Sequence, residues 1–227
     1  MDRTRNRSLG LRIALFLSIV VVAVGIGYYF LKPSDKLPIY HPNQLDQRLV
    51  DPSLKGAKGE HHISDFNLVD QFGGHFTLND VGDRIVVSDF FFTTCPTICP
   101  KMTVQMERVQ EAYKNEDKLL LLSHSVTPEM DSVPVLAAYA ELHRADPKRW
   151  RFLTGDRKQI YALARKSYFA AMDEGDGGPD DFVHTENFVL VDPQRRIRGF
   201  YDGTSPTDVD RLIADIAKLL KELNAAS

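Results

Sequence analysis

The sequence predicts an α/β domain with a central mixed sheet flanked by helices, preceded by an N-terminal transmembrane helix. Three observations lead to this prediction. Predominantly apolar runs, typical of buried strands, alternate with segments of helical periodicity. A glycine-containing hairpin comes before these runs, and a strand pair with a closing helix comes after them. A long uncharged stretch lies ahead of them all.

The elements of the domain follow one another without a repeat or a low-complexity tract. The predicted strands are a hairpin over 63–78 with its turn at 70–74, central strands at 85–92 and 119–126, a short strand at 151–153, and a pair at 188–191 and 197–201. The predicted helices are 101–114, 131–142, 156–167 and 205–223. The last helix has a capping serine, a first-turn proline and an acid at Ser205, Pro206 and Asp208.

The N-terminal stretch 13–31 contains no charged residue and is long enough to cross a bilayer. Residues 1–12 carry a net charge of +3, which favours a cytoplasmic N-terminus and places the domain on the periplasmic, extracytoplasmic side of the membrane. No small-residue cleavage site follows, so we expect an uncleaved signal anchor rather than a cleaved signal peptide. The remaining residues carry a net charge of −6, and nothing in them indicates nucleic-acid binding.

Between the anchor and the domain, residues 32–60 contain four prolines and two glycines, which favour an extended tether. The domain then covers 61–227. The pair His61 and His62 at its start has no partner at metal-ligand spacing, so we interpret it as solvated surface.

Cys95 and Cys99 are the only cysteines, and they stand where the first central strand passes into a helix. Their spacing allows them to share a metal ion or to close a disulfide. A helix N-terminus favours the thiolate, although Pro100 disfavours helical geometry at Cys99, so the cysteines could instead lie on the loop entering the helix. A structural disulfide is the alternative. Such a short loop would stabilise the fold little, which favours an active dithiol or a metal site. A strand ending at cysteines that open a helix indicates a thioredoxin-like arrangement.

Asp89 lies six residues before Cys95, inside the apolar strand. Thioredoxins keep a buried acid at this offset. A buried and unpaired carboxyl would have a raised pKa and could accept a proton as a thiol attacks. The alternative is a carboxyl satisfied by backbone donors or placed at a strand irregularity.

His184 stands on a loop just ahead of a buried strand. Two sulfurs and one imidazole nitrogen would make a three-coordinate site that suits Cu(I) and can adapt to Cu(II). A surface or hydrogen-bonding histidine is the alternative. We interpret Met102 and Met106 as core residues, Trp150 as packing, and His124 and His143 as structural or surface residues.

Three segments, FFTTCPTICPKMT (91–103), SVTPEMD (125–131) and VHTENFVLVDP (183–193), resemble the Sco/SenC family of copper proteins in order and separation. The resemblance covers residues 60–223 and extends to the anchor. It implies a thioredoxin-like fold, copper bound by Cys95, Cys99 and His184, and a role in assembling the dinuclear copper centre of cytochrome c oxidase. The chain departs from the family at Thr127 and Val183, where acids are usual.

Two functions follow from this reading. The first is a membrane-anchored copper chaperone whose partner is the copper-centre subunit of cytochrome c oxidase or another copper or thiol protein. The second is an enzyme, a thiol–disulfide oxidoreductase that reduces the cysteines of a partner protein. A third hypothesis is a binding module without redox chemistry, in which the two cysteines form a structural disulfide.

Overall fold

The computed structural model describes residues 15–28, 36–56, 59–173 and 182–226. The chain divides into two units, residues 1–35 and 36–227. In the first unit, residues 15–28 form a helix whose side chains are almost all exposed. Within the described residues, no helix combines the length and the apolar character needed to cross a membrane. The predicted anchor at 13–31 extends beyond the described residues at both ends, so it stays a prediction.

The second unit is built on a seven-stranded mixed sheet. In spatial order its strands are β2 (His75–Thr77), β1 (Asn67–Asp70), β5 (Trp150–Thr154), β4 (Leu119–Ser125), β3 (Ile85–Phe91), β8 (Asn187–Val191) and β9 (Ile197–Asp202). The three central strands β5, β4 and β3 are parallel, whereas β1, β2, β8 and β9 pair in antiparallel fashion with their neighbours. This is the predicted mixed sheet, with the hairpin at one edge and the late strand pair at the other.

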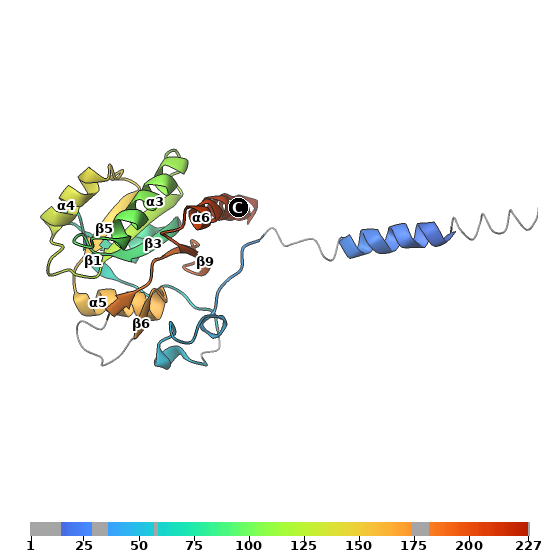
Figure 1. Cartoon of the computed structure of the whole chain (residues 1–227), viewed down its shortest axis with the longest axis horizontal. Coiled ribbons are helices and arrows are strands. Elements are labelled where there is room, and N and C mark those ends of the chain that lie inside the picture. The colour runs from blue at the N-terminus through green and yellow to red at the C-terminus, as the bar shows by residue number, and fades with distance from the viewer. Residues whose placement is uncertain (1–14, 29–35, 57–58, 174–181, 227) are drawn as a thin grey trace, which may run out of the picture. The chain divides into compact units, whose positions relative to one another are not determined.

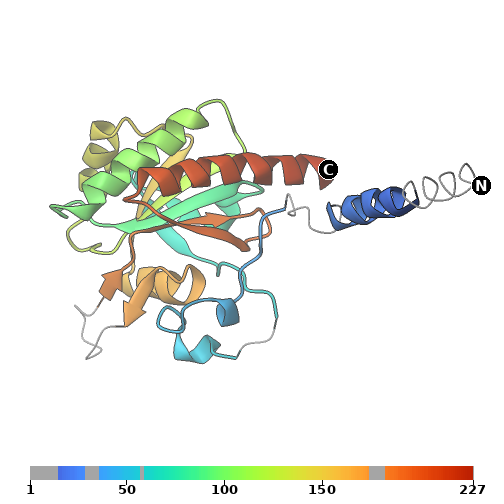
Figure 2. The ribbon, with the colours of Figure 1, turned by 45° about the vertical axis from the view of Figure 1, so that its right-hand side comes forward.

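Helices cover both faces of the sheet (Figure 1, Figure 2). One face packs against α3 (Ile98–Ala112), α4 (Val133–Leu142) and α6 (Pro206–Ala226). The other packs against α5 (Arg157–Ala162) and its π-helical continuation η3 (Leu163–Ser167). Every residue of β3 and β4 is buried, and alternate side chains of each strand enter different clusters. Both central strands are therefore covered on two faces, as predicted.

Two small elements complete the domain, and neither is predicted from the sequence. The short helix α2 (Leu78–Val81) follows β2. The strands β6 (Ala171–Asp173) and β7 (Phe182–His184) pair in antiparallel fashion and form a separate two-stranded sheet. Three-residue strands give too short a pattern for period-two alternation to be recognised.

Residues 36–56 lie against the domain, although their prolines predict an extended tether. They contain two short 3₁₀ helices, η1 (Pro42–Gln44) and η2 (Pro52–Leu54). Val50 is only 3 % exposed and belongs to the core, and the ring of Tyr40 packs edge-on against Phe200. Prolines prevent regular structure here, but apolar side chains between them still bury surface against the sheet.

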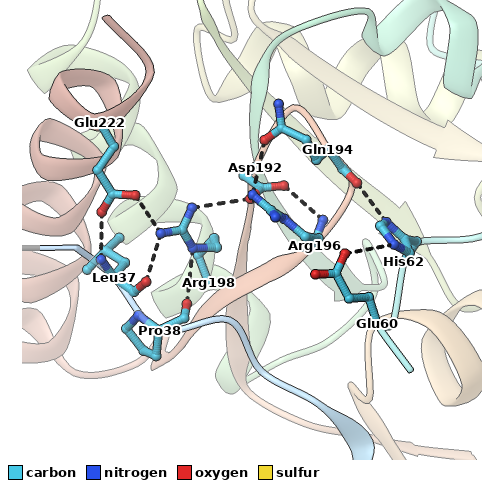
Figure 3. A network of polar contacts seen from close by, with 9 residues as sticks. All are labelled: Leu37, Pro38, Glu60, His62, Asp192, Gln194, Arg196, Arg198 and Glu222. Carbon is cyan, nitrogen blue, oxygen red and sulfur yellow. Dashed lines mark hydrogen bonds and ion pairs between the residues drawn. The ribbon is translucent and has the colours of Figure 1, made fainter. Parts of the chain in front are cut away.

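A buried arginine fixes the start of this segment (Figure 3). Arg198 of β9 is 5 % exposed and donates hydrogen bonds to the backbone carbonyls of Leu37 and Pro38. It also forms ion pairs with Asp192, at 3.2 Å, and with Glu222 of α6, at 2.6 Å. Glu222 in turn accepts a hydrogen bond from the backbone N–H of Leu37. These contacts join the N-terminal segment to β9 and α6.

Candidate metal centre

The two cysteines lie where β3 passes into α3, at the carboxyl edge of the parallel strands. Cys95 is in the connecting loop, where its N–H donates to the carbonyl of Phe92, and Cys99 is in the first turn of α3. The helix starts at Ile98, so Pro100 does not keep Cys99 out of it. Both thiols are free, and the backbone N–H of Cys99 points to the sulfur of Cys95 at 3.4 Å. Clefts beyond the carboxyl ends of parallel strands are the usual ligand sites of α/β folds.

The two thiols differ in their environment. Cys99 is 1 % exposed, and burial raises its pKa to about 12, with the nearby Cys95 sulfur and Asp89 carboxyl adding to the rise. Cys95 is partly exposed. Its partial burial acts to raise its pKa, but the backbone N–H groups of Cys99, Thr97 and Ile98 outweigh this effect and lower the pKa. Cys95 is therefore the accessible sulfur and the readier thiolate, and Cys99 is the protected partner.

Asp89 is buried in β3, as the sequence predicts, directly across from Ser123 of β4. Within the described residues its Oδ1 atom has no hydrogen-bond partner. Burial raises the pKa of this carboxyl to about 7, although a hydrogen bond with the Ser123 side chain acts to lower it. Since the strand shows no irregularity at this position and one oxygen lacks a donor, the carboxyl is not a fully satisfied structural group.

His184 is the last residue of the short strand β7 rather than part of a loop, so the predicted loop position is wrong, and its backbone is paired with Ala171 of β6. The next residue, Thr185, donates its N–H to the carbonyl of the buried Ala170 at 2.8 Å. The imidazole of His184 lies outside the described part of the structure, so its approach to the sulfurs stays a prediction. Among the side chains that the structure describes, no group of three histidine, cysteine or acidic residues is placed to hold a metal ion.

The other residues singled out by the sequence have packing roles. Met102 and Met106 are completely buried, as predicted for core residues. His124 is also completely buried rather than on the surface, and its ring stacks on Phe90 with centroids 4.8 Å apart. His61 is half-buried, where Nε2 meets the carbonyl of Ser167, so the solvated-surface interpretation is wrong for His61.

Asp131 contributes to the site in a way that the sequence does not reveal. The sequence offers both Asp131 and Ser132 as caps for the helix that ends at Leu142, and Ser132 is the N-cap residue of α4. Instead, the carboxylate of Asp131 is buried and accepts hydrogen bonds from the loop that carries Cys95. An acid six residues beyond the end of β4 gives no pattern from which such a long-range contact could be predicted.

Comparison with known proteins identifies the fold and the family. The family model described as SCO1/SenC matches residues 55–221. The chain belongs to the SCO1/SenC family. The "SCO1 protein homolog" of Bacillus subtilis is 32 % identical over 158 residues, which cover 69 % of this chain and 81 % of that protein. A protein of Stutzerimonas stutzeri whose name describes it as copper-binding is 30 % identical over 146 residues, 62 % of this chain and 69 % of that protein.

A solved SCO1/SenC structure agrees with the fold. The structure of BsSco, described as a member of the Sco family of cytochrome c oxidase assembly proteins with a disulfide switch, superposes with a TM-score of 0.60 at 31 % identity. It covers 70 % of this chain and 94 % of that one. The mixed α/β arrangement of residues 36–226 is therefore the thioredoxin-like fold of SCO1/SenC proteins.

One departure from the SCO1/SenC pattern has a structural explanation. Thr127 stands where the resemblance leads us to expect an acid, and its hydroxyl donates to Asp131 at 3.1 Å. A second carboxylate at this position would face that of Asp131 instead of stabilising it. The side chain of Val183, the other departure, lies outside the described residues.

Proposed function

We propose that this SCO1/SenC protein is a copper chaperone that binds copper through Cys95, Cys99 and His184 and delivers it to the dinuclear copper centre of cytochrome c oxidase. The observation that carries the proposal is the pair of free thiols, one accessible and one buried, held so closely that the N–H of one residue reaches the sulfur of the other. The names of two SCO1/SenC relatives, one copper-binding and one an oxidase assembly protein, support the metal and the partner.

The residues present fit a copper ion. Thiolates are soft ligands that select Cu(I), and an imidazole suits either oxidation state. Because burial raises the pKa of Cys99 to about 12, that thiol carries a proton at neutral pH, and copper must displace this proton to bind. The acceptor's ligands would first replace the accessible Cys95 and then Cys99, so the ion passes by ligand exchange without being free in solution.

We further propose that residues 13–31 anchor the protein, with the N-terminus in the cytoplasm and the domain in the periplasm. The basic residues ahead of the uncharged stretch support this orientation. A membrane-impermeant maleimide added to intact spheroplasts should label Cys95. If labelling requires lysis, the orientation is wrong.

Copper titration of the reduced full-length chain tests the chaperone. We expect one ion per chain, and His184→Ala should weaken binding on the order of 100-fold, because loss of a ligand should cost at least as much as loss of a residue that orients one. The control is His75→Ala, which removes an exposed histidine paired with Asn67. Equal affinity in the His184 and His75 variants would exclude His184 as a ligand.

A second function, thiol–disulfide exchange, is favoured by the buried carboxyl of Asp89. The Cys95 thiolate would attack a disulfide of the partner protein, forming a mixed disulfide and releasing one partner thiolate. Cys99 would then give its proton to the Asp89 carboxylate and attack Cys95, forming the Cys95–Cys99 disulfide and releasing the partner's second thiolate. Two electrons pass to the partner, and a reduced dithiol protein would restore the pair.

Replacing the carboxyl tests this second function. Asp89→Asn should slow reduction of a protein disulfide about 100-fold, the usual contribution of a positioned base. Copper affinity should change much less, because Asp89 is not a proposed ligand. Asp215→Asn, which alters a buried carboxyl elsewhere, is the control. An unchanged rate in Asp89→Asn would remove Asp89 from the mechanism.

A further inference from the structure

Asp131 is a buried carboxylate with an unusually complete set of donors. It lies between β4 and α4 and is 0 % exposed. Its Oδ1 accepts from the hydroxyl of Thr93 at 2.5 Å. Its Oδ2 accepts from the backbone N–H of Thr93 at 3.2 Å, from the Ser125 hydroxyl at 2.6 Å and from the Thr127 hydroxyl at 3.1 Å. Four charge-assisted bonds offset the cost of burying its charge.

These donors come from two different loops. Thr93 is two residues before Cys95 in the connection from β3 to α3, whereas Ser125 and Thr127 belong to the end of β4 and the loop after it. Both loops leave the sheet at the carboxyl edge of the parallel strands. The carboxylate therefore joins the cysteine loop to its neighbour, and it holds the cysteine loop at both a backbone and a side-chain atom of Thr93.

We propose that Asp131 is the positioning residue of the dithiol: it fixes the loop so that the Cys95 sulfur stays within reach of the Cys99 N–H. The consequence for copper rests on the proposed function, but the effect on the two sulfurs does not need a metal. Without the carboxylate, three hydroxyls and one backbone N–H lose their common acceptor. The cysteine loop then loses the contact that holds it in a single conformation.

Another buried carboxylate provides a matched control. Asp215 of α6 is 7 % exposed and accepts from the Tyr201 hydroxyl at 3.0 Å and from Lys218 at 2.7 Å. These partners belong to β9 and α6. Replacing Asp215 therefore disturbs a buried hydrogen-bonded carboxylate without touching the cysteine loop.

The experiment compares Asp131→Asn with Asp215→Asn in the full-length chain, kept in detergent, with two readouts. The first is the equilibrium constant for forming the Cys95–Cys99 disulfide from glutathione disulfide, measured without metal. We expect it to fall about tenfold in Asp131→Asn, because the sulfurs are less well prearranged. The second is copper affinity, which should fall about 10–100-fold, the usual effect of losing a residue that orients ligands. Asp215→Asn should change neither by more than about twofold.

The two readouts separate this proposal from the proposed function. If the wild-type chain binds no copper, the chaperone proposal fails, and the glutathione equilibrium still decides the role of Asp131. A rise in that constant, or a change below about twofold, would overturn the positioning role. If Asp131→Asn does not fold, Ser125→Ala and Thr127→Val each remove one donor and keep the carboxylate. Both should shift the constant in the same direction by a smaller factor, and no shift in either would overturn the proposal.

Discussion

At the end of the sheet where β8 turns into β9, all three side-chain nitrogens of the buried Arg198 donate hydrogen bonds (Figure 3). At the other end, where β3 leads to the cysteine loop and β4 ends beside it, Asp89 and His124 each keep one buried polar atom that has no partner among the described residues. Both ends bury ionisable side chains, but the guanidinium of Arg198 has a hydrogen bond on every nitrogen, whereas Asp89 and His124 do not have all their polar atoms satisfied.

The difference separates a structural role from a chemical one. A satisfied ion network fixes neighbouring segments, here the start of the globular unit against β9 and α6. An unsatisfied buried polar atom costs about 1–3 kcal/mol. Asp89 and His124 lie on adjacent strands, and their pKa values are shifted in opposite directions, to about 7 and about 4. The cysteine end therefore holds two groups that respond to protons, and one of them, Asp89, helps to raise the pKa of Cys99.

The largest effect is expected at the satisfied end. Arg198→Met should lower the free energy of unfolding by about 3–5 kcal/mol, because it leaves the buried Asp192 and the half-buried Glu222 with fewer donors. Urea denaturation measures the loss, and the glutathione equilibrium of the dithiol should not change. Arg48→Met, which removes a highly exposed ion pair with Asp46, is the control and should have no measurable effect. A loss below about 1 kcal/mol for Arg198→Met would show that this network is not what fixes the N-terminal segment.

Asp89→Asn should change how stability depends on pH. The pKa of Asp89 is about 7 in the fold against an ordinary value of 3.8, so the folded state binds a proton that the unfolded state has lost. This term stabilises the fold fully below pH 3.8 and is lost as the pH rises through 7, a total on the order of 4 kcal/mol. Asp89→Asn lacks this term, so the difference in unfolding free energy between the variant and the wild type should shift in favour of the variant as the pH rises from 4 to 7. Urea denaturation at a series of pH values measures this difference. Parallel curves for the two proteins would mean that this carboxyl is ionised throughout.

His124→Gln should have the opposite effect. Burial lowers the pKa of His124 from 6.5 to about 4, although a hydrogen bond with the Asp89 carbonyl acts to raise it. The unfolded chain therefore takes up a proton first as the pH falls below 6.5, which destabilises the fold by about 3 kcal/mol on reaching pH 4. The Asp89 and His124 terms cancel near pH 5 in the wild type. Removing His124 should leave only the Asp89 term, so that stability rises on acidification from pH 7 to 4. If the stability of His124→Gln stays level or falls between pH 7 and 4, other groups control this range.

The sequence predicts the architecture well because its strongest patterns are those of buried elements. The apolar runs at 85–92 and 119–126 became β3 and β4, and the capped helix at 205–223 became α6. The offset of Asp89 from Cys95 also predicts its burial correctly. Such features are local, because each depends on fewer than twenty consecutive residues.

The features that the sequence does not predict depend on contacts between distant segments. Arg198 meets Leu37 across 161 positions, and Asp131 meets Thr93 across 38. The local sequence around Asp131 is compatible with a helix cap, and the local sequence around Leu37 is compatible with an extended tether. Neither long-range contact can therefore be predicted from it. The strands β6 and β7, the second of which carries His184, pair with each other over three residues only, too few for their alternation to be recognised in the sequence.

The smallest effect is expected for α6, the helix that runs from the cysteine end of the sheet, where β9 leads into it, to Glu222 at the satisfied end. The hydroxyl of Ser205 accepts the N–H of Asp208 at 3.3 Å and so caps the helix start. Ser205→Ala should cost about 1 kcal/mol, and hydrogen exchange should quicken in the first turn only. Ser205→Asp keeps an acceptor and is the control. If exchange also quickened near Glu222, the two ends would be coupled through α6, and the division between a structural and a chemical end would not hold.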